Sequence, residues 1–189
     1  MIYLVRHGES VFNKENRAQG HSMNPLSEEG VMQVQNISED ILKLPITKIY
    51  CSDLKRAVQT AEILNKELNL PIVLDSRLRE FDCGESIRGL LKQDRPVDLY
   101  DNPKKYGAET APDVYIRMSD FLDELKANKV DNVLIVGHGG SLGMMMYILE
   151  NPALTKEDII KTMSNFTRAS VPFRYNLRNA EIVELDIYR

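Results

Sequence analysis

Short apolar runs alternate along the chain with segments in which apolar residues return at helical spacing. Four runs predict strands: Ile2–Val5, Lys48–Ser52, Ile72–Leu74 and Val133–Val136. Two sets of residues spaced three or four apart each predict a buried helix face: Ala57, Ala61, Leu64 and Leu68, then Val114, Met118, Phe121 and Leu125. This alternation is typical of βαβ units. It predicts an α/β fold, a three-layer sandwich with a mostly parallel central sheet and helices on both faces.

Local signals add two further helices. Ser27 precedes Glu28 and Glu29, and a serine followed by acidic residues is a common helix start, so we expect a helix from there to about Leu44. A second helix is expected from about Ser141, directly after the fourth strand.

Two regions depart from this pattern. Between residues 84 and 110 the periodicity fades, Pro96 and Pro103 interrupt it and basic residues collect, which predicts a small cap or lid. In the tail, Ala169–Tyr175 and Ile182–Ile187 predict two strands across a turn, one or both antiparallel to the rest of the sheet. We interpret residues 1–189 as a single domain that carries this cap.

Composition limits the classes of partner. The chain has 189 residues, 43% of them hydrophobic, which suffices for one buried core. A net charge of −4 argues against nucleic acid or an acidic membrane as a partner, since both require a broad basic surface. Met1 leads directly into a strand without a signal-like segment, so we expect a cytoplasmic protein. Cys51 and Cys83 are expected to be reduced structural thiols. The oligomeric state stays open.

Candidate chemistry lies where the predicted strands end. His7 follows the first strand, Arg56 opens the helix after the second, Glu80 follows the third and His138 ends the fourth. The carboxyl ends of parallel strands meet at one edge of a sheet, so these side chains are expected to converge. Phosphoryl transfer needs mainly positioning and positive charge on the equatorial oxygens, and Arg6, Arg56 and His138 can supply it.

His7 is the candidate nucleophile, because a neutral imidazole can attack phosphorus. Nearby arginines disfavour the imidazolium, and an acceptor on the other ring nitrogen, such as a backbone carbonyl in the Gly8 turn, would fix the tautomer. Glu80 is expected to protonate the leaving oxygen, provided that a neighbouring phosphate keeps it protonated, and then to activate water. A lone histidine is most often structural, and His21 is interpreted in that way.

Three sequence blocks resemble one known family. Leu4 to Ser10 read Leu-Val-Arg-His-Gly-Glu-Ser, the block from Ser52 reads Ser-Asp-Leu-Lys-Arg-Ala, and Val136 to Gly140 contain the second histidine. These blocks resemble the histidine phosphatase superfamily, the phosphoglycerate mutase-like proteins. The resemblance implies that His7 becomes phosphorylated and that phosphate or substrate contacts come from Asn13, Gln19, Gly20 and Gly139.

The resemblance weakens near the cap. After Glu80 the family commonly shows glycine, an apolar residue, glutamate and glycine, whereas this chain has Gly84-Glu85-Ser86-Ile87-Arg88-Gly89. Gly107 to Thr110 likewise replace the usual Gly-Glu-Ser. These departures affect the expected substrate contacts and leave the phosphate chemistry intact.

Other chemistries fit less well. Gly139 to Gly143 spell a serine-hydrolase elbow, but no histidine follows Ser141 to complete a triad. Cys51 and Arg56 have the wrong spacing for a cysteine phosphatase, and the three dispersed histidines lack the spacing of metal ligands. No nucleotide-binding P-loop motif occurs. No cofactor and no metal are therefore expected.

The resulting hypothesis is a metal-independent phosphatase that acts, through a phosphohistidine, on a small phosphorylated metabolite or a phosphoprotein. Two alternatives stay open. One is a cofactor-dependent phosphoglycerate mutase. The chain departs from the mutase pattern after Glu80, where mutases typically show Arg-His-Tyr-Gly and this chain has Phe81 to Gly84. The other is a noncatalytic protein that binds a phosphorylated ligand.

Overall fold

A five-stranded sheet forms the centre of the molecule. The structure is a computed structural model and describes residues 1–163 and 177–187. The strands are β1 (Ile2–Arg6), β2 (Lys48–Cys51), β3 (Ile72–Leu74), β4 (Val133–Gly137) and β5 (Ile182–Leu185), in the spatial order β3-β2-β4-β1-β5. β5 pairs antiparallel with β1, and the other pairings are parallel. This confirms the predicted mostly parallel sheet with an antiparallel C-terminal strand; the strand predicted at residues 169–175 lies outside the described residues.

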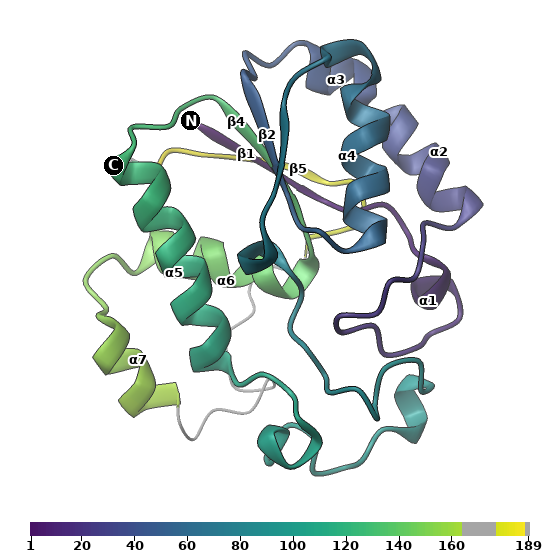
Figure 1. Cartoon of the computed structure of the whole chain (residues 1–189), viewed down its shortest axis with the longest axis vertical. Helices are drawn as coiled ribbons and strands as arrows, with labels where there is room; N and C mark the ends of the chain where they lie inside the picture. The colour runs from purple at the N-terminus through teal and green to yellow at the C-terminus, as the bar shows by residue number, and fades with distance from the viewer. Residues whose placement is uncertain (164–176, 188–189) are drawn as a thin grey trace.

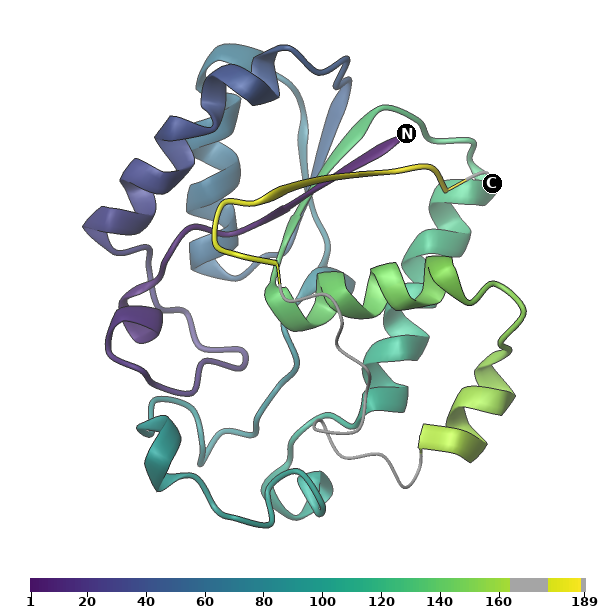
Figure 2. The same cartoon turned by 180° about the vertical axis from the view of Figure 1, so that it is seen from behind.

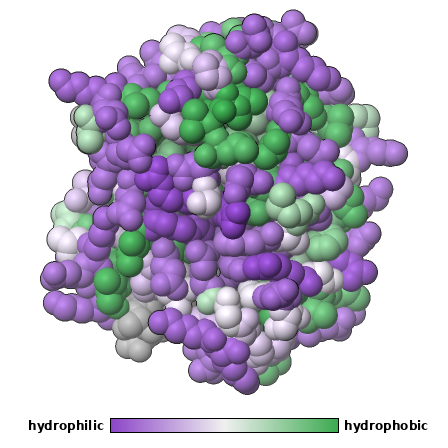
Figure 3. All heavy atoms as spheres, viewed as in Figure 1, coloured by the Kyte–Doolittle hydropathy of each residue, from purple (hydrophilic) through white to green (hydrophobic). Residues whose placement is uncertain are grey.

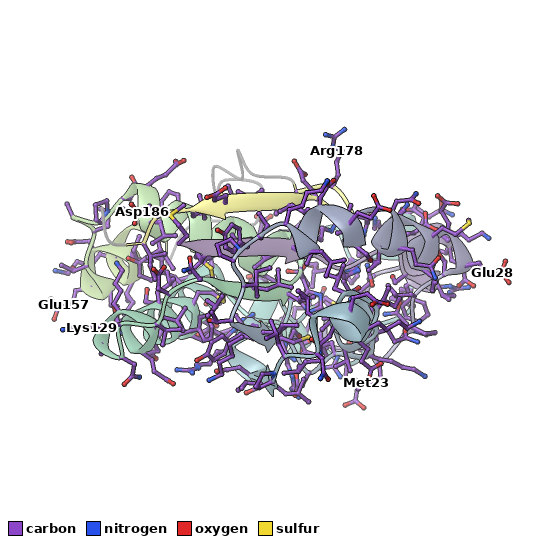
Figure 4. The ribbon with its side chains drawn as sticks, turned by 90° about the horizontal axis from the view of Figure 1, so that it is seen from above. Met23, Glu28, Lys129, Glu157, Arg178 and Asp186 are labelled. Carbon is purple, nitrogen blue, oxygen red and sulfur yellow. The ribbon has the colours of Figure 1, made fainter. Side chains whose placement is uncertain are left out.

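Helices cover both faces of the sheet (Figures 1 and 2). On one side lie α2 (Glu28–Asn36), α3 (Ser38–Leu42) and α4 (Lys55–Leu68), and on the other α5 (Ala111–Ala127), α6 (Gly139–Glu150) and α7 (Lys156–Met163). Figure 4 shows the sheet between the two layers, with Glu28 and Glu157 on opposite sides. The three-layer prediction is confirmed.

Alternation along β1 explains how one sheet holds two cores. Tyr3 and Val5 pack with α2, α3 and α4, whereas Ile2 and Leu4 pack with α5, α6 and α7. Successive side chains on a strand point to opposite faces, so a strand covered on both sides must be apolar throughout. This fixes β1 in the middle of the molecule and leaves its carboxyl end, at His7, beside that of β4.

The predicted helix from Ser27 to about Leu44 is wrong in one respect, because it is divided into α2 and α3 at Ile37. The Ser38 hydroxyl donates to the Val34 carbonyl at 3.2 Å, and that carbonyl is the acceptor that a continuous helix assigns to residue 38. Ile41 is fully buried, so the second segment still packs against the sheet layer.

Three other helices differ from the predictions, one in its start and two because they were not predicted. α6 begins at Gly139, two residues before Ser141, with His138 as its N-cap. α7 was not predicted, nor was α1 (Val11–Lys14), whose four residues are too few to show a period. Ser10 and Asn13 form a capping box at the start of α1, so side-chain hydrogen bonds define this short helix.

The predicted cap contains little regular structure. Between α4 and α5, apart from β3, the described chain forms only three short 3₁₀ turns: η1 (Ser76–Leu78), η2 (Lys92–Asp94) and η3 (Pro103–Tyr106). Ala18, Ile87 and Leu99 form a small apolar cluster separate from the two main cores. The cap, residues 84–110, therefore depends on few buried side chains.

The surface is not uniform on the face shown in Figure 3, because apolar side chains gather over its upper part and the surface below is largely hydrophilic. Leu74, in edge strand β3, is 54% exposed. Among the described helices, none has the length and apolar character needed to cross a membrane.

Candidate active site

The sheet brings the predicted catalytic groups together. β1 and β4 are neighbours, and the amide of His7 donates to the Gly137 carbonyl at 3.0 Å, which sets the two strand ends level. The ring centroids of His7 and His138 lie 5.1 Å apart. Arg56, at the start of α4, places its Nε 3.3 Å from His7 Nε2. The expected convergence at the carboxyl edge is confirmed for these three residues.

His7 is held as a neutral imidazole whose Nε2 lone pair accepts a hydrogen bond from Arg56 Nε. Its Nδ1 lies 2.6 Å from the Gly8 carbonyl oxygen, which can only accept, so Nδ1 carries the hydrogen and Nε2 keeps its lone pair. Burial, followed by the charges of Arg56 and Arg6, lowers the pKa of His7 well below its ordinary value. The expected acceptor in the Gly8 turn is therefore confirmed, and the nitrogen that faces Arg56 is the one that carries the lone pair.

The turn after β1 can exist only with a glycine at position 8. A Cβ there would lie 2.4 Å from the Gly30 carbonyl oxygen of α2. On the other side, Asn179 Nδ2 donates to the His7 carbonyl at 2.8 Å from the loop before β5. The backbone around His7 is thus fixed from both sides, and Asn179 was not foreseen from the sequence because it lies 172 positions away.

Arg56 is fully buried and is wedged between His7 and the loop after α1. Its Nη1 donates to the Ser22 carbonyl at 2.9 Å and its Nη2 to the Gly20 carbonyl at 3.0 Å. Burial lowers the pKa of Arg56 to about 10, which still leaves it charged at neutral pH. The guanidinium of Arg56 was expected to bind an oxyanion. In the structure its terminal nitrogens hold this loop against His7.

Arg6 retains a donor that the described residues leave unused. Its Nη1 donates to the Leu177 carbonyl at 2.5 Å, whereas its Nε is buried and has no hydrogen-bond partner among the described residues. Burial lowers the pKa of Arg6, and the nearby carboxylates of Glu80 and Glu181 oppose that effect. The guanidinium also lies against Gly139, where a Cβ would be 3.4 Å from its Cζ.

His138 presents the second unused nitrogen. Its Nε2 lies 2.8 Å from Ser52 Oγ, while its buried Nδ1 has no partner among the described residues. Ser52 Oγ also accepts from the Leu54 amide at 3.3 Å, and in the tautomer in which its hydroxyl donates to Nε2, Nδ1 carries the ring hydrogen. Burial and the charge of Arg56 lower the pKa of His138 well below its ordinary value. In that tautomer Nδ1–H is a neutral donor.

Glu80 lies in the same cluster of charges, and its carboxylate raises the pKa values of both Arg6 and Arg56. The carboxyl oxygens accept from the Phe81 amide at 2.9 Å and from the Gly140 and Ser141 amides at 3.1 Å each, at the start of α6. A helix N-terminus attracts an anion in this way. The segment that carries Glu80 therefore reaches across to the loop of the second histidine.

Two residues that were not foreseen at the site hold the backbone of Glu80. His21 Nε2 lies 2.8 Å from the Glu80 carbonyl oxygen, and Arg117 Nη2 of α5 donates to the same oxygen at 3.1 Å. His21 is thus structural, as interpreted, but it is located at the site. Arg117 lies three positions after Val114 in an amphipathic pattern, and the sequence offered no signal to separate it from a solvated arginine.

The four residues expected to contact phosphate or substrate fall into two groups. Asn13 and Gln19 direct their side-chain oxygens at Ser10: Asn13 Oδ1 accepts from its amide at 3.1 Å and Gln19 Oε1 from its hydroxyl at 2.7 Å. Gly20, with φ of +46°, and Gly139 instead contact the two arginines. The structure therefore places only the two glycines directly against the phosphate-binding candidates.

The competing nucleophiles are engaged elsewhere. Ser141 is fully buried, and its Oγ donates to the Leu78 carbonyl at 3.2 Å, so the apparent serine-hydrolase elbow is a packed helix start. Cys51 is also fully buried, and burial raises the pKa of its thiol. Within residues 1–163 and 177–187, no cluster of three histidine, cysteine or acidic residues could hold a metal ion.

Comparison with known proteins gives a consistent family. A model of the histidine phosphatase superfamily (branch 1) matches residues 2–186. "Probable phosphoglycerate mutase GpmB" of Enterobacter sp. is 32% identical over 98% of this chain and 84% of its own length. "Putative phosphoserine phosphatase 2" of Hydrogenobacter thermophilus is 32% identical over 78% of this chain and 77% of its own length.

Solved structures with this fold include phosphatases. A mycobacterial glucosyl-3-phosphoglycerate phosphatase in complex with VO3 has a TM-score of 0.73 and 26% identity, covering 96% of this chain and 88% of its own. Bacillus stearothermophilus YhfR has a TM-score of 0.75 and 28% identity, covering 98% and 91%. The α/β sheet and its helix layers are thus shared over nearly the full length.

Proposed function

Because the chain belongs to the histidine phosphatase superfamily (branch 1), we propose that it hydrolyses phosphomonoesters through a phosphohistidine at His7, without a metal ion. One observation carries the proposal: the Nε2 lone pair of a buried, neutral imidazole faces Arg56, and in the same cluster of side chains Arg6 Nε and His138 Nδ1 are buried without a partner among the described residues. An unsatisfied buried donor costs about 1–3 kcal/mol, and phosphate oxygens would satisfy both.

The chemistry has two balanced steps. First, His7 Nε2 forms a bond to phosphorus as the bond to the leaving oxygen breaks, and Glu80 gives that oxygen a proton. Second, water attacks the phosphohistidine, Glu80 takes its proton, and inorganic phosphate leaves as the bond to Nε2 breaks. Arg6, Arg56 and His138 would stabilise the equatorial oxygens in both steps, which is the part that a metal ion plays elsewhere.

We propose a small phosphorylated metabolite or a phosphoprotein as the substrate. A cofactor-dependent phosphoglycerate mutase is the second candidate, because the GpmB relative carries that name at 32% identity. The two functions share the first step and differ in the fate of the phosphoryl group: a phosphatase delivers it to water, and a mutase returns it to its substrate. A binder that keeps the site without turnover would perform neither step.

Phosphate release from a panel of monoesters, with a chelator present, tests the proposal. We expect release by the parent protein, an acid-labile ³²P adduct in quenched turnover, and loss of both in His7→Ala. Lys126→Met, an exposed substitution on α5, is the matched control and should retain both. Faster interconversion of phosphoglycerates than hydrolysis would favour the mutase, saturable binding without turnover would favour the binder, and an active His7→Ala would disprove the mechanism.

A further inference from the structure

Arg117 connects the cap side of the site to α5. Besides its bond to the Glu80 carbonyl, its Nη1 donates to the Arg77 carbonyl. The same guanidinium forms a two-point contact with Glu109, with Nε to Oε1 at 2.9 Å and Nη2 to Oε2 at 3.0 Å. A planar fork on a carboxylate has one preferred geometry, so Glu109 fixes the direction in which Arg117 points.

Glu109 in turn fixes the residue after Phe81. Its Oε2 accepts from the Asp82 amide at 2.9 Å, and its own amide donates to the Asp82 carbonyl at 2.9 Å. Arg117 and Glu109 thereby hold the Glu80 segment at three backbone groups: the carbonyl of Glu80 and both groups of Asp82. From Arg79 to the start of η2 the described chain has no helix or strand. Side chains therefore provide the hydrogen-bond partners that backbone groups would otherwise find in a helix or a sheet.

His21, from the loop after α1, binds the same Glu80 carbonyl oxygen as Arg117. The Glu80 carbonyl can only accept, so the His21 Nε2 that lies 2.8 Å away carries a hydrogen. His21 Nδ1 lies 3.7 Å from Asp82 Oδ2, and Nε2 lies 3.7 Å from Glu109 Oε2. The loop after α1, the start of α5 and the Glu80 segment therefore converge at one carbonyl oxygen.

We infer that Arg117, oriented by Glu109, is a positioning residue for the Glu80 carboxyl, which sets its reach to the leaving oxygen. This inference rests on the proposed function. Arg117 touches the backbone of Glu80 and none of the reacting atoms, whereas the carboxyl one side chain away is the proton donor. A displacement of about 1 Å at a reacting group can cost roughly 100-fold in rate. Loss of Arg117 should therefore weaken proton donation selectively.

The leaving group distinguishes positioning from general stability. An alkoxide leaves only with a proton, whereas p-nitrophenolate leaves readily without one. The value of kcat/KM reports steps up to formation of the phosphohistidine and is independent of the later attack by water. A poorly placed Glu80 should thus lower kcat/KM for an alkyl phosphate and spare it for p-nitrophenyl phosphate.

The experiment compares Arg117→Met with the matched control Lys126→Met on 2-glycerophosphate and p-nitrophenyl phosphate. We expect kcat/KM for the alkyl ester to fall about 10- to 100-fold in Arg117→Met. For the aryl ester it should change less than about 3-fold, because little proton donation is needed there. Glu80→Gln should give the same selectivity, and the double variant should lose no more than Glu80→Gln alone.

Several results would overturn the inference. Equal losses on both esters, or additive losses in the double variant, would make Arg117 a purely structural residue. If Arg117→Met fails to fold by circular dichroism, Glu109→Gln, which keeps the shape and removes the charge, takes its place with the same expected selectivity. A ³²P adduct that forms with unselective losses defeats only this inference, whereas a parent protein without any adduct defeats the proposed function.

Discussion

Two parts of the candidate site are held in place differently: the floor, formed by His7, Arg56 and His138, and the cap side, formed by Arg88, Arg117 and His21. On the floor, His7, Arg56 and His138 follow strand ends or open a helix, and each is at most 2% exposed. On the cap side, Arg88, Arg117 and His21 are held by side-chain contacts to Asp82 and Glu109, and they retain 31%, 15% and 18% side-chain exposure. The floor is held by buried strand ends, whereas the cap side is held by a few partly solvated charge pairs.

This difference suits the chemistry. The phosphoryl group is common to every phosphomonoester, so its donors can be fixed in advance by strands and buried charges. The leaving group differs between substrates, and in the proposed mechanism it is served by Glu80, whose segment continues into the divergent residues 84–110. Substitutions on the floor are therefore expected to damage reactions with all substrates, and substitutions in the cap to act weakly or selectively.

The largest effect is expected from Arg56→Lys on the floor. Lysine cannot bond His7, Gly20 and Ser22 at once, so kcat/KM should fall about 10²- to 10³-fold for every ester. Unsatisfied carbonyls should also lower the free energy of unfolding by about 1–3 kcal/mol. Steady-state kinetics and urea unfolding measure the two losses. Retained activity would show that a lysine ammonium at position 56 can replace the several hydrogen bonds of the arginine guanidinium.

The free energy of unfolding should depend on pH through the two buried histidines of the floor, His7 and His138. Burial lowers the pKa values of His7 and His138 well below the ordinary value, so the unfolded chain binds protons that the folded protein excludes. The free energy of unfolding should be highest above about pH 6.5 and fall by up to about 1.4 kcal/mol per pH unit for each histidine as the pH drops further.

Urea unfolding between pH 5 and 7.5 measures this slope. His138→Gln should reduce it by about half, while the cap variant Arg88→Ala should leave it unchanged. Activity should not decline near pH 6.5 through protonation of His7, because burial and the two arginines keep the ring neutral there. A stability that is flat over this range would contradict the buried neutral state.

Ser52→Ala should have an intermediate effect. Its hydroxyl holds the His138 ring through the 2.8 Å contact with Nε2, so its loss should lower kcat/KM about 10-fold and leave KM less affected. Ser38→Ala removes a hydroxyl that donates to the Val34 carbonyl where α2 ends and α3 begins, and it should leave kcat/KM intact. If both variants behave alike, the contact with His138 has no part in catalysis.

The smallest effect is expected from Arg88→Ala in the cap. Its ion pair with Asp82 is partly exposed, so the free energy of unfolding should change by less than about 1 kcal/mol, and by less still at high salt. Thermal unfolding at two salt concentrations checks this. A loss as large as that of Arg56→Lys would remove the distinction between floor and cap.

Much of the floor was predictable because it depends on local order. Apolar runs located the strands, and the rule that parallel strands end at one edge of the sheet predicted from the sequence alone that His7, Arg56 and His138 lie together. The Gly8 carbonyl was foreseen as the acceptor because it is one residue from the ring. Even here, Ser52 gave no sign of its contact with His138, although it lies within the second motif.

The cap side could not be predicted in the same way. His21 and Arg117 meet at the Glu80 carbonyl from 59 and 37 positions away, and no periodicity records such a contact. Such features depend on which side chains meet across distant segments.

The sequence alone sufficed to predict four strands, most of the longer helices and the groups at the strand ends, because hydrophobic periodicity and strand direction are local properties of the chain. Only the folded structure settles which ring nitrogen of His7 carries the hydrogen, which buried donors lack a partner among the described residues, and how Glu80 is held. These depend on angles and distances between segments that are remote in the chain, and burial in a shared core sets them.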